Sequence, residues 1–267
     1  MSLSGKTINL DQVEKIYQTR TGPVQALSKI SVNLDSGSFV SIVGPSGCGK
    51  STLMNLIAGL DTTPHGSIRI NGEKINGPVD GNAVVFQKDV LLDWRSVIDN
   101  VLLPLEIQGI SWWSRPNRKT NKERAKELLE LVGLKGFEDK YPHELSGGMR
   151  QRVAICRALI QEPELLFMDE PFGALDALTR EQMMYDLLRI YNKYKFTCIF
   201  ITHSIEEAVF LSDRVLVMSS RPGKLVKDIS INLPRPRNSE SRNDSNFTGH
   251  VNEIRSIFKT QGILSEV

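Results

Sequence analysis

The sequence predicts an α/β fold with a mostly parallel sheet, preceded by an antiparallel β layer near the N-terminus. Short apolar runs alternate along the chain with longer segments that have helical spacing, a pattern typical of a parallel sheet covered by helices. Ahead of these units, apolar residues alternate over residues 24–34, and the turn residues Asp35, Ser36 and Gly37 follow. This first segment therefore indicates antiparallel strands.

The expected strands are short apolar runs bounded by turn residues. The run at 39–43 reads FVSIV and leads directly into a glycine-rich segment, and the run at 165–168 reads LLFM and ends at an acidic pair. In chain order, we expect strands at residues 7–17, 24–34, 39–43, 67–70, 83–86, 165–168 and 198–201.

The expected helices carry apolar residues at helical spacing and end at glycine or before proline. Gly59 and Gly133 are such stops, and Pro163 follows a third helix. In chain order, we expect helices at residues 51–58, 121–132, 148–160, 178–194 and 204–211. Residues 234–246 contain almost nothing to bury and are expected to form an exposed linker. Val251, Ile254 and Phe258 then share one face of a short C-terminal helix that can pack on the body.

Composition and charge exclude several classes of protein. The chain has 267 residues, 40% of them hydrophobic, so it is not disordered as a whole. Its 33 Lys and Arg against 31 Asp and Glu leave a net charge of +2, which argues against nucleic-acid binding through the whole surface. No apolar run is long enough for a membrane-spanning helix, and no apolar region follows the charged N-terminus as in a secretory signal. We therefore expect a cytosolic protein.

The three cysteines, Cys48, Cys156 and Cys198, are far apart and form no CxxC or Cys/His cluster. This spacing argues against both a disulfide framework and a zinc site. We expect them to be reduced thiols.

Residues 44–51 read GPSGCGKS and match GxxxxGK[ST] between an expected strand and an expected helix. Glycines let the backbone wrap a polyphosphate, and the start of the helix offers free N–H groups. Lys50 is expected to reach the outer phosphates and Ser51 to ligate Mg²⁺. The expected nucleotide-binding residues here are Gly44, Pro45, Ser46, Gly47, Cys48, Gly49, Lys50, Ser51 and Thr52. The segment predicts a P-loop, and an accidental glycine-rich turn explains it poorly.

Asp169 and Glu170 follow the buried-strand run, at the sheet edge where α/β proteins bind ligands. Asp169 is expected to hold Mg²⁺ through water, and Glu170 to orient and deprotonate the water that attacks the γ-phosphate. The alternative is an acidic helix cap before Pro171. Together with the P-loop, this pair predicts a P-loop NTPase.

Residues 145–149, LSGGM, resemble the LSGGQ signature of the ATP-binding cassette (ABC) family, with Met149 in place of glutamine. Further motifs of that family follow in order, so the resemblance covers about residues 7–213. Gln87 is similar to its Q-loop, residues 173–176 to its D-loop and His203 to its H-loop, and Tyr17 stands where the family places an aromatic against adenine. Read singly, Gln87 can be a surface residue, His203 a helix cap, Tyr17 a core aromatic and Ser146 an ordinary N-cap.

The resemblance implies a RecA-like core with a helical signature subdomain at about 88–160, within an ATP-binding domain of residues 1–233 and before a tail at 234–267. It implies that two subunits pair head to tail around two ATP molecules. Glu170, His203, Gln87 and Lys50 are then catalytic, and Ser51, Gln87 and Asp169 surround Mg²⁺. Tyr17 then binds adenine, while Ser146, Gly147, Gly148 and Asp176 contribute to the ATP site across the dimer.

The implied function is ATP hydrolysis that drives transport through separate membrane subunits, at the cytoplasmic face of the cell membrane. Residues 88–100, with Trp94, are the implied contact with the permease, although Trp94 can also be a core residue. Trp112, Trp113 and the basic run 115–124 can reach membrane headgroups or the partner subunit, or they can form a solvated helix face.

Residues 91–95, 169–176 and 233–237 look most like the nitrate, sulfonate and taurine importer branch, whose solute is delivered by a binding protein. An ABC exporter or lipid-transport ATPase, or an ABC ATPase without a membrane partner, is the alternative. A small-molecule P-loop kinase leaves residues 145–149 and His203 unexplained.

Overall fold

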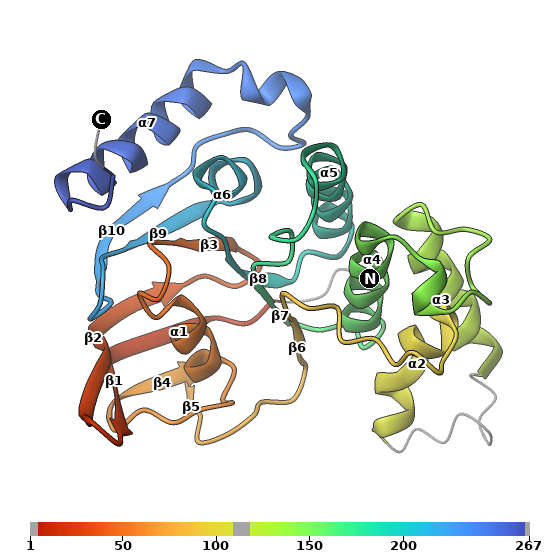
Figure 1. The fold of residues 1–267 in the computed structure, drawn as a ribbon, viewed down its shortest axis with the longest axis horizontal. Coiled ribbons are helices and arrows are strands. Elements are labelled where there is room, and N and C mark those ends of the chain that lie inside the picture. Colours follow the sequence, from red (N-terminus) through yellow and green to blue (C-terminus); the bar gives the residue numbers. More distant parts are fainter. Residues whose placement is uncertain (1–4, 109–117, 265–267) are drawn as a thin grey trace.

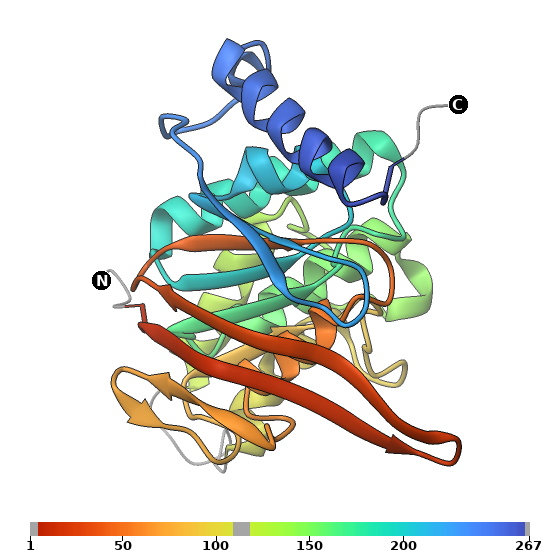
Figure 2. The same cartoon turned by 90° about the vertical axis from the view of Figure 1, so that its left-hand side faces the viewer.

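The computed structural model describes residues 5–108 and 118–264, and its strands form two sheets (Figure 1). The antiparallel sheet has the order β2-β1-β4-β5, and its first two strands form a long hairpin (Figure 2). Its members are β1 (Ile8–Thr19), β2 (Gly22–Leu34), β4 (His65–Ile70) and β5 (Glu73–Lys74). The N-terminal antiparallel layer is therefore confirmed.

The larger sheet has the order β10-β9-β3-β8-β7-β6, and all its neighbouring strands are parallel except β10, which pairs antiparallel with β9. Its members are β3 (Phe39–Val43), β6 (Asn82–Val85), β7 (Leu165–Asp169), β8 (Thr197–Ile201), β9 (Arg214–Met218) and β10 (Leu225–Ser230). The mostly parallel sheet is confirmed, whereas β9 and β10 were not among the expected strands.

Seven α-helices lie within the described residues: α1 (Lys50–Ile57), α2 (Val97–Ile107), α3 (Arg118–Leu131), α4 (Gly147–Leu159), α5 (Ala177–Tyr194), α6 (Ile205–Leu211) and α7 (Ser245–Thr260). Two 3-10 turns accompany them, η1 (Pro142–Glu144) and η2 (Ser239–Arg242). The sequence pattern missed α2, because Pro104 lies inside it. In these described parts of the chain, no helix has both the length and the apolar character needed to cross a bilayer.

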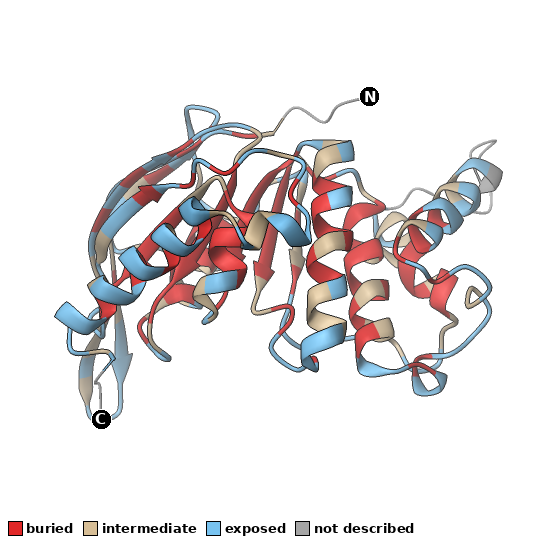
Figure 3. Ribbon diagram, turned by 90° about the horizontal axis from the view of Figure 1, so that it is seen from above, coloured by how far each residue is buried: buried red, intermediate tan, exposed pale blue. Residues whose placement is uncertain are grey.

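Two apolar cores lie on the two faces of the parallel sheet, and alternate residues of each strand contribute to one or the other. In β3, Val40 and Ile42 face a core shared with α1 and the antiparallel sheet, whereas Phe39 and Val43 face the core under α4, α5 and α6. The second core continues into α2 and α3, which form a lobe beside α4 (Figures 1 and 3). A sheet buried on both faces explains why its strands have continuous apolar sequences.

The C-terminal helix α7 packs on α6 through Phe247, Val251, Ile254 and Phe258, at the top of Figure 1. The segment before it differs from the expected exposed linker at two arginines. Arg235 forms an ion pair with Asp213 at 2.8 Å. Arg237 is buried, and its guanidinium donates to the carbonyls of Val209, Phe210, Ser212 and Leu233. Burial, together with the nearby charge of Arg235, lowers the pKa of Arg237 to about 10. The domain boundary at residue 233 stays a prediction.

Candidate active site

The carboxyl ends of the parallel strands meet at one edge of the sheet, and a polar segment follows each of them. The P-loop follows β3, Gln87 follows β6, Asp169 ends β7 with Glu170 directly after it, and His203 follows β8. The register is continuous, because Ile201 of β8 pairs with both Ile42 of β3 and Asp169 of β7. Strand order therefore brings together motifs that are far apart in the sequence.

A cavity of about 690 Å³ opens at this edge. Its lining combines the hairpin of β1 and β2, the P-loop, the ends of two parallel strands and one turn. The lining residues are Tyr17, Thr19, Val24, Ala26, Ser46, Gly47, Gly49, Lys50, Ser51, Thr52, Gln87, Asp169, Glu170 and Arg221. Its size is within the usual range for a small-ligand site.

The P-loop has the geometry of an anion cradle. Gly49 caps the N-terminus of α1 with φ of 103°, and a side chain there would meet Leu27 Cδ2 at 2.7 Å, so the position requires glycine. The buried Lys50 donates from Nζ to the carbonyls of Gly44 and Pro45, each at 3.0 Å. The lysine is therefore held at the centre of the loop, beside the free N–H groups of α1.

Ser51 and Asp169 form an oxygen-rich corner of the cavity. Ser51 Oγ donates to Asp169 Oδ1 at 3.1 Å. Burial raises the pKa of Asp169, an effect that the Ser51 hydrogen bond opposes. No group of three or more His, Cys, Asp or Glu side chains that could hold a metal exists in the described ranges. One hydroxyl, one carboxylate and the Gln87 amide nevertheless suit a Mg²⁺ ion that takes its other ligands from water and phosphates.

Glu170 lies close to two other predicted catalytic residues, His203 and Gln87. Its Oε2 is 3.3 Å from His203 Nδ1, and a side chain built at Gly173 would come within 3.3 Å of Gln87 Nε2. The reading of His203 as a helix cap is wrong, because Ser204 caps α6 by accepting from the Glu207 N–H. Gln87 is exposed, as its alternative reading requires, and it also lines the cavity.

A buried carboxylate supports the segment that carries His203. Thr202 Oγ1 donates to Glu207 Oε2 at 2.5 Å, and Arg180 of α5 lies 3.6 Å from the other oxygen of Glu207. Burial raises the pKa of Glu207, and the Thr202 hydrogen bond and Arg180 oppose that rise. Arg180 also donates to the Leu175 carbonyl at 3.0 Å, so the network links the segments around Leu175 and His203.

Tyr17 is not a core aromatic. Its side chain lines the cavity and is 38% exposed, and its hydroxyl donates to Asp61 Oδ2 at 3.0 Å. Lys15 Nζ lies 4.9 Å from the centre of its ring. An anchored ring at the cavity wall is suited to stacking on a planar base.

The structure leaves several predicted site residues outside this cavity. Ser146 caps α4 by accepting from the Met149 N–H, which is the structural role of its alternative reading. Asp176 caps α5 in the same way by accepting from the Thr179 N–H. The Cys48 thiol is buried in the core beneath the P-loop, and burial raises its pKa. The predicted residues that do not line the cavity are Gly44, Pro45, Cys48, Ser146, Gly147, Gly148, Asp176 and His203.

The sequence prediction missed Arg221, which lines the cavity from the turn after β9. The sequence did contain a sign of this strand. Residues 215–218 read VLVM and are followed by polar residues, which is the same pattern as in the strands that precede the other site segments. The run was too short to be distinguished from a buried helix segment without its neighbours in the sheet.

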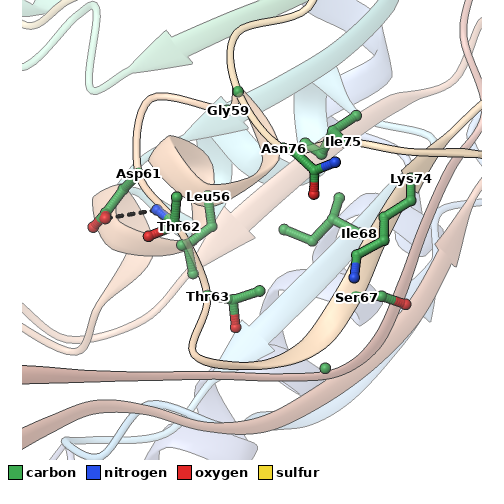
Figure 4. Close-up of a pocket in the computed structure, with 12 residues that line it drawn as sticks. Leu56, Gly59, Asp61, Thr62, Thr63, Ser67, Ile68, Lys74, Ile75 and Asn76 are labelled. Carbon is green, nitrogen blue, oxygen red and sulfur yellow. Dashed lines mark hydrogen bonds between the residues drawn. The ribbon is translucent and has the colours of Figure 1, made fainter.

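A second, smaller cavity of about 130 Å³ lies between the end of α1 and the β4–β5 hairpin (Figure 4). Asp61 and Thr62 lie on one side of it, where the Thr62 N–H donates to Asp61 Oδ1, and Lys74 and Asn76 lie on the other. None of the predicted catalytic residues lines it.

Comparison with known families agrees with this geometry. Residues 27–173 match the family model described as ABC transporter, which covers more than half of the chain. The chain belongs to the ABC transporter family. It is an ATP-binding, ATP-hydrolysing cassette of that family, as its signature, Q-loop and H-loop motifs predict.

Similar proteins in the ABC transporter family include several import subunits. The aliphatic sulfonates import ATP-binding protein SsuB of Bacillus cereus is 43% identical over 258 residues, covering 97% of this chain and 98% of that protein. The taurine import ATP-binding protein TauB of Rhizobium johnstonii is 48% identical over 229 residues, covering 85% of each chain. The nitrate import ATP-binding protein NrtD of Synechocystis is 41% identical over 258 residues, covering 94% of this chain and 95% of that protein.

A solved ABC cassette has the same fold. The cassette MJ0796, determined as a dimer in a post-hydrolysis state bound to ADP and Pi, matches with a TM-score of 0.72 and 31% identity. The match covers 84% of this chain and 99% of that one. The predicted α/β fold class and family are therefore confirmed.

Proposed function

We propose that this ABC ATPase powers the import of a small anion, of the sulfonate, taurine or nitrate kind, through separate permease subunits. The main support for this proposal is the similarity to import subunits along nearly the whole chain, since 97% of the chain aligns with SsuB of Bacillus cereus. The cassette holds no site for the solute in this proposal, because the solute contacts the other subunits.

The catalytic proposal gives roles to predicted site residues of this chain that lie in or beside the cavity. Lys50 neutralises the outer phosphates, and Tyr17 stacks on the base. Glu170 accepts a proton from the attacking water, and His203, 3.3 Å away, holds the carboxylate and contacts the γ-phosphate. Ser51, Asp169 and Gln87 would hold Mg²⁺, which supplies charge neutralisation at the β- and γ-phosphates when bound.

The active assembly in this proposal is a dimer of two cassettes with ATP between them. Ser146 and Asp176 do not line the cavity of their own chain, so any contact they make with ATP needs a second copy. Leu178, two residues after Asp176, has 81% of its surface exposed, so its side chain is accessible to a second copy. The solved MJ0796 cassette is a dimer.

The permease contact is proposed at the segment after β6, beside the helical lobe. Phe86, Val90 and Trp94 are all exposed, and Trp94 has 75% of its surface accessible. Trp94 is therefore not a core residue, and exposed aromatic side chains of this kind are typical anchors of protein interfaces. Trp112, Trp113 and the first half of the basic run, residues 115–119, lie outside the described side chains. A permease bound here would hold the cassette at the cytoplasmic face of the membrane as a peripheral subunit.

The test is purification of the tagged chain with its membrane partners, followed by reconstitution into vesicles. ATPase activity is measured with binding proteins loaded with a sulfonate, taurine, nitrate or bicarbonate. We expect one loaded binding protein to raise the rate and the unloaded protein to have little effect. If no loaded protein raises the rate, the import proposal is wrong, and an exporter or an ATPase without a membrane partner explains the fold better.

A further inference from the structure

The turn that joins β9 to β10 is hydrogen-bonded to β2 beside the nucleotide cavity. Gly223 at its centre exchanges two backbone hydrogen bonds with β2, donating to Ala26 at 2.9 Å and accepting from Ser28 at 2.8 Å. Any side chain at Gly223 would meet the Cys48 carbonyl of the P-loop at 2.0 Å. The turn therefore lies in direct contact with the phosphate-binding loop, and its backbone hydrogen bonds to β2 fix its position.

Ser219 closes the turn from its other end. Its hydroxyl donates to the carbonyls of Ser220 and Pro222 and accepts from the Lys224 N–H at 3.2 Å. Its own N–H donates to the Lys224 carbonyl at 3.0 Å. With both ends bonded, the backbone that carries Arg221 is ordered before a ligand arrives, which reduces the entropy cost of binding.

Arg221 presents its guanidinium to the cavity from this turn. A β-carbon placed at Gly47 would lie 4.0 Å from Arg221 Nη2, so the charge is next to the top of the P-loop. Over residues 5–108 and 118–264, Arg221 has no hydrogen bond, ion pair or ring contact. Lys50, the other cation of the lining, already donates to Gly44 and Pro45. Of the two cations that line the cavity, Arg221 is therefore the one whose N–H donors have no hydrogen-bond partner among the described residues.

The location of the turn identifies which part of a nucleotide the guanidinium meets. Arg221 lies near the β1–β2 hairpin, which carries Tyr17, and near the P-loop at Gly47. Its strand, β9, and the strand that leads to the carboxylates, β7, lie on opposite sides of β3 in the sheet. The backbone of a P-loop cradles the α- and β-phosphates, whereas its lysine reaches the β- and γ-phosphates. A planar guanidinium pairs well with phosphate oxygens.

We propose that Arg221 binds the phosphate chain of the nucleotide at the phosphates that ATP and ADP share. The proposal rests on ATP binding alone and is independent of the direction of transport and of the solute. It assigns to the nucleotide site a residue outside the P-loop and the strand-end motifs, and it gives the β9–β10 turn a role in holding the product as well as the substrate.

The experiment measures affinity for ATP and for ADP by isothermal titration calorimetry on the full chain. Arg221→Ala, Arg221→Lys and the matched control Lys224→Ala are compared with the unmodified protein. Lys224 is exposed on the same turn and does not line the cavity, so its removal changes the net charge equally. Since Arg221 is itself exposed, we expect all variants to fold, and thermal unfolding checks this.

We expect Arg221→Ala to weaken the binding of both nucleotides by about 10-fold or more, the usual loss for one charge-assisted hydrogen bond. Arg221→Lys restores part of the loss, and Lys224→Ala stays within about twofold of the unmodified protein. Three results would overturn the proposal. The first is unchanged binding of both nucleotides in Arg221→Ala, and the second is a loss confined to ATP, which would place Arg221 at the γ-phosphate. The third is an equal loss in Lys224→Ala, which would mean that the net charge of the turn alone causes the effect.

Discussion

Glu170 Oε2 and His203 Nδ1 lie 3.3 Å apart, although the two residues are 33 positions apart in the chain. The backbone holds Glu170 in place, because its N–H donates to the Ile201 carbonyl at 3.0 Å and its φ is 46°. Non-glycine residues adopt this left-handed conformation at a cost of about 1–3 kcal/mol, and such positions cluster at active sites. The carboxylate is therefore aimed by the pairing of two neighbouring strands.

Glu170→Gln tests the role of this carboxylate as a base. Glutamine keeps the shape and can still hydrogen bond to His203, but it cannot accept the proton of water, so we expect turnover to fall by about 100-fold or more. ATP should still bind and hold two cassettes together, which light scattering measures. Lys50→Ala is the control, with nucleotide binding itself lost. A Glu170→Gln protein that stays monomeric with ATP would argue against the ATP-bridged dimer.

Asp169→Asn tests the magnesium assignment. Asparagine still accepts the Ser51 hydrogen bond, whereas the charge that attracts a divalent cation is lost. In EDTA, we expect ATP affinity to stay within about twofold of the unmodified protein, because the P-loop itself is intact. The gain in affinity on adding Mg²⁺ should be largely lost, as titration with and without the metal measures. A full Mg²⁺ response in the variant contradicts the assignment.

Trp94→Ala tests the permease surface. Since Trp94 is exposed and does not line the nucleotide cavity, we expect basal ATPase activity of the isolated chain to stay within about twofold. Copurification with membrane subunits should fail or weaken strongly, because aromatic anchors carry much of the energy of an interface. Leu60→Ala removes an exposed apolar side chain next to α1 and serves as the control. Equal losses in both variants would place the contact elsewhere.

The buried thiols predict how stability depends on pH. Burial raises the pKa of Cys156 and Cys198 above the ordinary thiol value. As pH rises through about 8.5, these thiols ionise in the unfolded chain and stay protonated in the folded one. The unfolded state then binds fewer protons, so the free energy of unfolding falls above that pH. Urea unfolding at several alkaline pH values measures the slope, which should be smaller in the double variant Cys156→Ala/Cys198→Ala. An identical slope in the two proteins counts against this origin.

The packing of α7 predicts a stability change at one residue. Ile254 is fully buried in the core that α7 shares with α6, so Ile254→Ala leaves a cavity and should cost about 2–4 kcal/mol in urea unfolding. Asn252→Ala, on the exposed face of the same helix, should change the free energy of unfolding by less than about 0.5 kcal/mol. Similar values for both variants would mean that the helix adds little to the fold.

Much of the site was predictable because its chemistry is local. Lys50 and Ser51 belong to one continuous loop, and Asp169 and Glu170 directly follow one apolar run, so residue type and neighbouring sequence were enough. Exposure was harder to predict, because an aromatic residue has the same local pattern in a core and at a surface. Tyr17 and Trp94 were therefore left with two readings each, and contacts across the fold decided between them.

By itself, the sequence determined the fold class, the phosphate-binding loop and the family, since strand and helix periodicity and short motifs depend on neighbouring residues. Only the tertiary structure decided which segments meet. The sheet order β10-β9-β3-β8-β7-β6 places Arg221 beside the P-loop. The packing of α5 against α6 places Glu207 between Thr202 and Arg180. Such proximity comes from strand pairing and helix packing between distant residues, and no local pattern in the chain records it.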